Sequence, residues 1–189
     1  AQLRLSLTVG SHRITLAATD SDQNTTTTSI TLAVQPAANA GPTANAGANK
    51  TGQEGDAISF DGSRSTDSDG IVASYLWTFG DGTSSAEASV SHVFADDGNY
   101  SVRLTVTDDS GAQGSDTIQV AIQNVAPVAR THGPYAGTVG EPIQFSGSVE
   151  DPGINDSHTF AWDFGDGTSG IGPGAEHTFN AAGDFNATL

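Results

Sequence analysis

One strand-and-turn motif occurs twice in this chain, at Trp77–Thr83 and again at Trp162–Thr168. In both copies a tryptophan and a phenylalanine are separated by one polar residue, which places the two rings on one face of an extended strand. The Gly-Asp-Gly that follows tolerates the positive φ angles of a tight hairpin turn. The two tryptophans are 85 positions apart. A repeat of that length indicates two copies of a domain rather than the short units of a solenoid.

The hydrophobic pattern predicts short β-strands along the chain. Tyr100, Val102, Leu104 and Val106 alternate with polar residues without a break, and no segment shows a competing helical period. Several short strands separated by Gly- and Asp-rich turns indicate an antiparallel β-sandwich, so we predict an all-β fold class. The strands expected in the first full domain are Ala57–Phe60, Ser74–Phe79, Ser89–Phe94, Tyr100–Thr107 and Thr117–Ile122.

The repeat divides the chain into four parts. Residues 1–35 hold two strand patterns, too few to bury a core, and are interpreted as the last two strands of an immunoglobulin-like domain. Residues 36–43 form a linker rich in Pro and Ala. Residues 44–124 are predicted to form a complete domain, and residues 125–189 a second copy that lacks its last strand or strands.

Two aromatic residues narrow the type of sandwich. Trp77 lies on a central strand and Tyr100 opens a later one, an arrangement typical of the tryptophan core and the tyrosine corner of immunoglobulin-like domains. Val102 stands where that fold places its second cysteine, so apolar packing must replace the disulfide. Both aromatic side chains are expected in the core rather than at a ligand site.

The motif Trp-x-Phe-Gly-Asp-Gly, followed by a His-x-Phe strand at His92 and His177 and then by Gly-x-Tyr or Gly-x-Phe, resembles the PKD (polycystic kidney disease) domain. The resemblance covers residues 42–189 in two copies, and the N-terminal segment departs from it by having His12 at the tyrosine position. It implies tandem immunoglobulin-like, PKD-type antiparallel β-sandwiches located outside the cell. It also implies spacers, binding modules or assembly units without catalytic activity. Such modules are common in bacterial and archaeal surface proteins and as accessory domains of secreted hydrolases.

The chain is strongly acidic, with 22 Asp and Glu against 6 Lys and Arg and a net charge of −16. Such a surface repels nucleic-acid phosphates and anionic lipids, so neither is expected as a partner. It attracts divalent cations or suits a high-salt medium, and it also fits a surface that only keeps the protein soluble. No stretch approaches 18 apolar residues, so no direct membrane insertion is expected in this segment. The absence of cysteine excludes disulfides and zinc–thiolate sites.

The chain is not expected to be an enzyme. His92 and His177 occupy the same position of the repeat, which favours a structural role, such as a hydrogen bond to a nearby turn backbone, over catalysis. No Gly-x-Ser-x-Gly nucleophile motif occurs. Paired carboxylates fall in turns, where solvation is the ordinary explanation.

Calcium binding is the chemical hypothesis that the sequence supports best. Asp67 and Asp69 place hard oxygen ligands in one loop, and Asp108 follows in a later turn. The PKD resemblance implies a calcium site near the interdomain end, with an asparagine near the domain start, and its candidate ligands are Asn45, Asp67, Asp69 and Asp108. The second copy departs from this pattern with Glu150–Gly153. The alternative is a plain Asx-rich turn whose carboxylates cap backbone N–H groups.

Five asparagines fit the N-glycosylation pattern Asn-x-Ser/Thr. Combined with the acidic surface, the absence of cysteine and the PKD resemblance, the pattern favours a glycan-bearing protein of a bacterial or archaeal cell envelope. Asn24, in a threonine-rich turn, is the acceptor that we favour. The full set is Asn24, Asn49, Asn99, Asn155 and Asn186.

We interpret the chain first as a non-enzymatic structural protein of the cell surface or of an extracellular filament, whose partners are copies of itself or adjacent repeats. Residues 183–189 repeat the role of residues 10–16, so the N-terminal segment of one chain could complete the open domain of another and polymerise head-to-tail. A window from a longer tandem array is the plainer explanation. The alternative functions are accessory spacer or binding domains of a secreted protease or glycosidase, and an adhesin.

Overall fold

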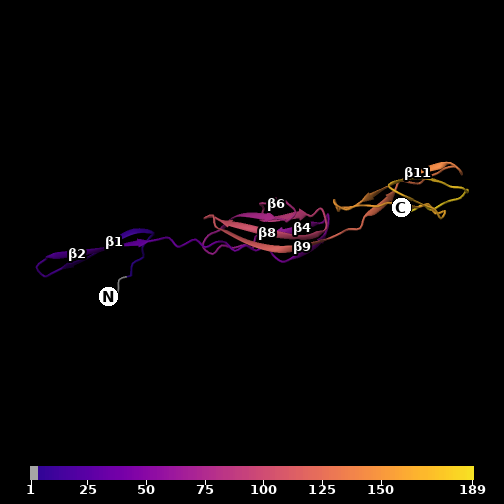
Figure 1. The fold of residues 1–189 in the computed structure, drawn as a ribbon. Coiled ribbons are helices and arrows are strands. Elements are labelled where there is room, and N and C mark those ends of the chain that lie inside the picture. Colours follow the sequence, from indigo (N-terminus) through magenta and orange to yellow (C-terminus); the bar gives the residue numbers. More distant parts are fainter. Residues whose placement is uncertain (1–3) are drawn as a thin grey trace. The chain divides into compact units, whose positions relative to one another are not determined.

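The computed structural model describes residues 4–189, which form strands β1 to β14 and no helix. The all-β fold class predicted from the sequence is therefore confirmed. The chain divides into two compact units between Ala40 and Gly41, and Figure 1 shows the strands of each. Within residues 4–189 no helix is long and apolar enough to cross a membrane.

The N-terminal unit contains one long hairpin. Strands β1 (Gly10–Thr19) and β2 (Thr25–Val34) pair antiparallel along their whole length. Asp20 closes the turn, because its Oδ1 accepts the backbone N–H groups of Asp22 and Asn24 at 2.9 Å each. Most side chains of the hairpin are exposed, as expected of a two-stranded sheet. Its interpretation as the end of an immunoglobulin-like domain stays a prediction.

Residues 41–124 form the first sandwich, in which a five-stranded sheet packs on a two-stranded one. The larger sheet has the order β3-β9-β8-β5-β6, and the smaller pairs β4 with β7. Strand β3 runs parallel to β9, so the expected antiparallel pairing does not hold at this edge. The strand bounds are β3 (Lys50–Gln53), β4 (Ala57–Asp61), β5 (Val72–Thr78), β6 (Ser84–Ser85), β7 (Ser89–Val93), β8 (Gly98–Asp108) and β9 (Gln113–Gln123).

The core of the first sandwich lies between its two sheets. Trp77 is fully buried, and its ring centroid lies 5.5 Å from that of Phe60 on β4. The buried residues of β8 alternate with more exposed ones, as the sequence pattern predicted. Burying one large apolar side chain contributes about 1.5–3 kcal/mol. The buried set is Ala46, Phe60, Trp77, Phe79, Phe94, Val102, Leu104, Val106, Ile118, Val120 and Ile122.

Tyr100 forms the predicted tyrosine corner. Its Oη donates a hydrogen bond to the carbonyl of Asp96 at 2.9 Å, and its ring packs on Phe94 with the centroids 4.4 Å apart. Burial raises the pKa of the Tyr100 hydroxyl, and nearby carboxylates, first that of Asp96, raise it further. The hydroxyl therefore stays protonated and remains a donor.

Residues 125–189 form the second sandwich, in which the β4–β7 and β5–β6 pairings of the first sandwich recur as β11–β14 and β12–β13. Its sheets have the orders β10-β11-β14 and β12-β13. Phe145, Trp162 and Phe164 form its buried core, at repeat positions equivalent to buried aromatic residues of the first sandwich. The strand bounds are β10 (Val128–Thr131), β11 (Pro142–Glu150), β12 (Ala161–Asp163), β13 (Ser169–Ile171) and β14 (Gly174–Thr178).

The repeated Gly-Asp-Gly turn brings two backbones into close approach. Gly80 has φ 85°, and a Cβ there would lie 2.9 Å from the carbonyl oxygen of Ser101. Gly165 has φ 77°, and a Cβ there would lie 2.7 Å from the carbonyl oxygen of Asn186. Glycine is required at both positions by the positive φ angle and by the lack of space.

In both copies a histidine holds the aspartate of this turn. His92 Nε2 lies 2.6 Å from Asp81 Oδ2, and His177 Nε2 lies 2.8 Å from Asp166 Oδ2. Each imidazole also stacks on a core phenylalanine, with centroid distances of 4.0 and 4.2 Å. This arrangement fits the structural role predicted for the two histidines, although each ring bonds a turn side chain and not the turn backbone.

Candidate metal-binding site

The loop that follows β11 lies against the first sandwich. Asp151 begins this loop, and its Oδ1 accepts the backbone N–H of Gly153 at 3.0 Å, which forms an Asx-type turn. Ile154 then donates its backbone N–H to the carbonyl of Ala95 in the first sandwich at 3.0 Å. These hydrogen bonds place the carboxylates of the loop at the junction of the two sandwiches.

Glu54 approaches the same junction from the turn after β3. The residue is 2% exposed, and its Oε1 accepts the backbone N–H of Val125 at 2.8 Å. Its other oxygen, Oε2, is buried and has no hydrogen-bond partner among the described residues. A buried acceptor left unpaired costs about 1–3 kcal/mol, and more when it is charged. A hydrogen-bond donor or a cation placed beside this oxygen would therefore stabilise it.

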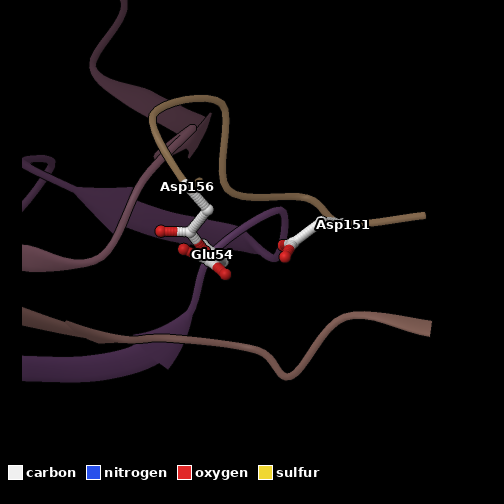
Figure 2. Close-up of side chains that lie close together, drawn as sticks. All are labelled: Glu54, Asp151 and Asp156. Atoms are coloured by element: carbon white, nitrogen blue, oxygen red, sulfur yellow. The ribbon is translucent and has the colours of Figure 1, made fainter. Parts of the chain in front are cut away.

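Glu54, Asp151 and Asp156 each bring one carboxylate oxygen to within 4.8 Å of the others (Figure 2). Figure 2 shows the three side chains arriving from two segments, the turn after β3 and the loop after β11. Gly153 keeps the space between them open, because a Cβ there would lie 2.7 Å from Asp156 Oδ2 and 3.0 Å from Glu54 Oε2. We call these three carboxylates the junction site.

Two further carboxylates flank Glu54 on the first sandwich. One oxygen each of Asp96 and Asp97 lies within 4.8 Å of a Glu54 oxygen and of the other. The side-chain amide of Asn155 donates a hydrogen bond to the Asp96 carboxylate, which links Asp96 to the loop after β11. Negative charge therefore gathers on both sides of the junction.

Asp151 is held in its ionised form. His158 Nε2 lies 2.8 Å from Asp151 Oδ2, and this hydrogen bond, followed by the one from the N–H of Gly153, lowers the pKa of Asp151. Its side chain is only 4% exposed. Ionised carboxylate oxygens are the ligands that hard cations such as Ca²⁺ prefer.

The calcium ligands predicted from the sequence lie in the first sandwich and do not form such a group. Within residues 4–189, Asp67, Asp69 and Asp108 do not bring three carboxylate oxygens within 4.8 Å of one another. Asn45 and Asp108 instead accept backbone N–H groups of their own turns, at 2.8–3.0 Å. These hydrogen bonds fit the Asx-turn alternative, and calcium binding by these two residues stays a prediction.

Asp67 retains one feature of a ligand. Its Oδ2 is buried and has no hydrogen-bond partner in the part of the chain that the structure describes. This oxygen and Asp109 Oδ1 both lie close to Gly70, at 2.7 and 2.6 Å from the position that a Cβ would take. Calcium binding in this loop stays a prediction, and Asp109 is a further carboxylate that lies close to Asp67.

Sequence reasoning did not find Glu54. The residue stands in an ordinary polar turn, Gln53–Asp56, and its partners are distant in the sequence. The one sequence feature that pointed to the junction site is the acidic loop Glu150–Gly153, whose residues differ from those of the first copy of the repeat. Only the folded chain brings the two segments together.

All five asparagines of the glycosylation pattern are exposed. Asn24 lies in the turn of the N-terminal hairpin, where its Nδ2 donates to Asp20 Oδ2 at 3.1 Å. Asn49 Oδ1 accepts the backbone N–H of Gln119 at 2.9 Å. Accessible side chains are what glycan attachment requires, and the attachment itself stays a prediction.

Known proteins of similar sequence include proteases. The chain is 33% identical over 147 residues to a microbial collagenase of Vibrio alginolyticus, covering 70% of this chain and 18% of the collagenase. It is 48% identical over 67 residues to the pre-pro-metalloprotease PrtV of Vibrio cholerae, covering 34% of this chain and 7% of that protein. The chain thus spans less than a fifth of the length of either relative.

A solved structure and a family model were also found to resemble parts of this chain. The PKD1 domain of Vibrio anguillarum Epp is 35% identical, with a TM-score of 0.40, and the match covers 46% of this chain and 98% of that domain. The model of the PKD domain family matches residues 39–122 and 124–189, which together include both sandwiches. The chain therefore belongs to the PKD domain family.

Proposed function

We propose that this chain is a non-catalytic accessory region of a secreted hydrolase that acts on a protein substrate. The observation that carries the proposal is the similarity to the Vibrio alginolyticus collagenase over 147 residues, a length that one sandwich alone does not supply. The matched stretch is 18% of that collagenase. Such a share fits a region that stands beside a separate catalytic part.

An extracellular location belongs to the same proposal. Collagen is an extracellular protein, so a collagenase-like enzyme that carries these domains works outside the cell. The net charge of −16 supports solubility there and disfavours nucleic acid as a partner.

The inferred role of the two sandwiches is to position other parts of the enzyme. Each sandwich has its own aromatic core. The hydrogen bond from Ile154 to Ala95 and the one from Val125 to Glu54 restrict the joint between them. A restricted joint limits the distances between a catalytic domain and a surface-bound substrate, which raises the effective concentration of the enzyme at that surface.

The surface filament expected first from the sequence has less support than the accessory role. The two relatives described above are named as proteases, and neither name refers to a filament or another polymer. Head-to-tail self-association, adhesion and glycan attachment stay predictions.

Deletion in the full-length gene product tests the proposal. Removing residues 41–189 should lower the rate of hydrolysis of insoluble collagen by about tenfold or more, because the enzyme loses its placement at the surface. Hydrolysis of a short soluble peptide should stay within about twofold. A control variant replaces the segment with a Gly/Ser linker of an equal number of residues. This linker still connects the parts of the enzyme, but it is flexible and does not hold them at a fixed distance. A full-length protein without hydrolase activity, or an equal loss on both substrates, would contradict the proposal.

A further inference from the structure

We propose that Glu54, Asp151 and Asp156 bind Ca²⁺, and that the bound ion clamps the second sandwich onto the first. The site lies at the joint between the sandwiches. The proposal therefore does not depend on which protein carries the two domains.

The first support is the buried carboxylate of Glu54. The residue is 2% exposed, and its Oε1 is already occupied by the N–H of Val125. Its Oε2 has no hydrogen-bond partner in the described part of the chain. A buried anionic oxygen without a donor is stabilised by a cation placed beside it.

The second support is the convergence of oxygens on an open space. Glu54 Oε2 and Asp156 Oδ2 lie 3.0 and 2.7 Å from the point where a side chain on Gly153 would begin. One oxygen of Asp151 lies within 4.8 Å of the oxygens of the other two carboxylates (Figure 2). Gly153 is itself buried, so the gap is part of the packed junction and not of an open surface. Oxygens at this spacing repel each other unless a cation lies between them.

Asp151 remains able to bind a metal although both of its oxygens accept hydrogen bonds. Oδ1 accepts the N–H of Gly153, and Oδ2 lies 2.8 Å from His158 Nε2. Each carboxylate oxygen has two lone pairs, so each keeps one for a metal. The two hydrogen bonds orient the carboxylate, as partners of metal ligands commonly do.

The donor set favours Ca²⁺ over other common divalent cations. All three ligands are carboxylates, and Ca²⁺ accepts six to eight oxygens in a flexible geometry that waters can complete. Mg²⁺ demands near-ideal octahedral geometry and releases its waters reluctantly. Zn²⁺ prefers nitrogen and sulfur ligands. Asp96 and Asp97, which form a second group with Glu54, add negative charge that further attracts the ion.

Calcium at this site would act on the joint. Glu54 belongs to the first sandwich, whereas Asp151 and Asp156 belong to the second. An ion that binds all three carboxylates binds only when the loop after β11 is docked. Calcium therefore shifts the joint toward the docked arrangement by mass action.

Calorimetric titration of the 189-residue chain, stripped of metal with a chelator, tests the binding. We expect a saturable Ca²⁺ site with a Kd of about 10⁻⁴–10⁻³ M, as in extracellular modules. Glu54→Gln and Asp156→Asn should each weaken binding at this site by about tenfold or more, because each removes a charged ligand. The matched control Glu87→Gln removes one charge from an exposed residue outside the site and should leave the Kd unchanged.

Two titration results would overturn the proposal. One is a wild-type chain without saturable Ca²⁺ binding. The other is binding that Glu54→Gln leaves unchanged and Asp67→Asn abolishes, which would place the ion in the loop of the first sandwich. The Gln variant is expected to fold, because its amide oxygen still accepts the N–H of Val125. Its amide nitrogen takes the place of the unpaired Oε2 and can donate to the neighbouring Asp156 carboxylate.

Distance measurements test the clamp separately from the binding. The chain has no cysteine, so the exposed pair Ser91→Cys and Ser169→Cys accepts two spin labels at defined positions. Calcium should narrow the distribution of label distances in the wild-type background and leave it unchanged with Glu54→Gln. A distribution that calcium does not narrow, or narrows equally in the variant, would overturn the clamp.

Discussion

The backbone N–H of Val125 donates a 2.8 Å hydrogen bond to Oε1 of Glu54, which ties the segment between the two sandwiches to the turn after β3. The other oxygen of the same carboxylate lies beside Asp156, on the loop that docks from the second sandwich. One buried side chain thus connects the linker and the docking loop. Its charge explains why a cation at this point would influence the whole joint.

Calcium should stabilise the folded chain, and the gain should rise with the logarithm of the free Ca²⁺ concentration once that concentration exceeds the Kd. At a free Ca²⁺ concentration 100 times the Kd, the free energy of unfolding is expected to rise by about 2.7 kcal/mol. Glu54→Gln should remove this increase, and it should be at least as stable as wild type without calcium, because it relieves carboxylate repulsion. Urea unfolding followed by tryptophan fluorescence measures both effects. An equal calcium-dependent rise in the variant would contradict the prediction.

Replacing Trp77 by alanine should destabilise the first sandwich by about 3–5 kcal/mol, because it removes a fully buried indole and leaves a cavity. The neighbouring Leu76 is 45% exposed, so Leu76→Ala should change the free energy of unfolding by only about 0.5 kcal/mol. Equilibrium urea unfolding compares the two variants. Similar losses for both would mean that the indole is not the centre of the core.

The two glycines of the first Gly-Asp-Gly turn separate backbone strain from steric overlap. Gly80 has φ 85° and Gly82 has φ 92°, so alanine is strained at either position by about 1 kcal/mol. A Cβ at Gly80 would also lie 2.9 Å from the carbonyl of Ser101, whereas a Cβ at Gly82 would have no neighbour within 4 Å. Gly80→Ala should therefore cost about 1–3 kcal/mol more than Gly82→Ala in thermal or urea unfolding. Equal costs would show that the turn moves freely away from Ser101.

Acid should weaken the first sandwich through Asp61. The backbone N–H of Ser63, then its hydroxyl and that of Ser89, hold the pKa of Asp61 at about 2, below its ordinary value of 3.8. Because the folded pKa is the lower one, the stabilisation is present above pH 3.8 and is lost as the pH falls toward 2. An NMR titration should give the low pKa directly, and Asp61→Asn should make the stability less dependent on pH in this window. A measured pKa near 3.8 would contradict the prediction.

Local patterns predicted the strands whose residues alternate clearly. The alternation from Tyr100 to Val106 became β8, and the repeated aromatic motif became two equivalent cores. Strand β3 was missed because Lys50–Gln53 shows no apolar alternation. Its extended form comes from parallel pairing with β9, which is a tertiary interaction.

The junction site could not be predicted from local sequence patterns, because it also depends on a tertiary interaction. An aspartate in a polar turn has the same sequence signature whether it caps a backbone N–H, as Asp108 does, or faces another carboxylate, as Asp156 does. The difference depends on the docking of the loop after β11 onto the first sandwich. Glu54 became a candidate only when that docking showed one of its oxygens to be buried without a partner.

The most direct test of the calcium clamp is the anomalous scattering of crystals of the 189-residue chain grown with calcium. The proposal predicts an anomalous peak between the two sandwiches, with oxygens of Glu54, Asp151 and Asp156 at about 2.3–2.6 Å from it. A peak confined to the loop of Asp67 and Asp109, with none at the junction, would contradict it.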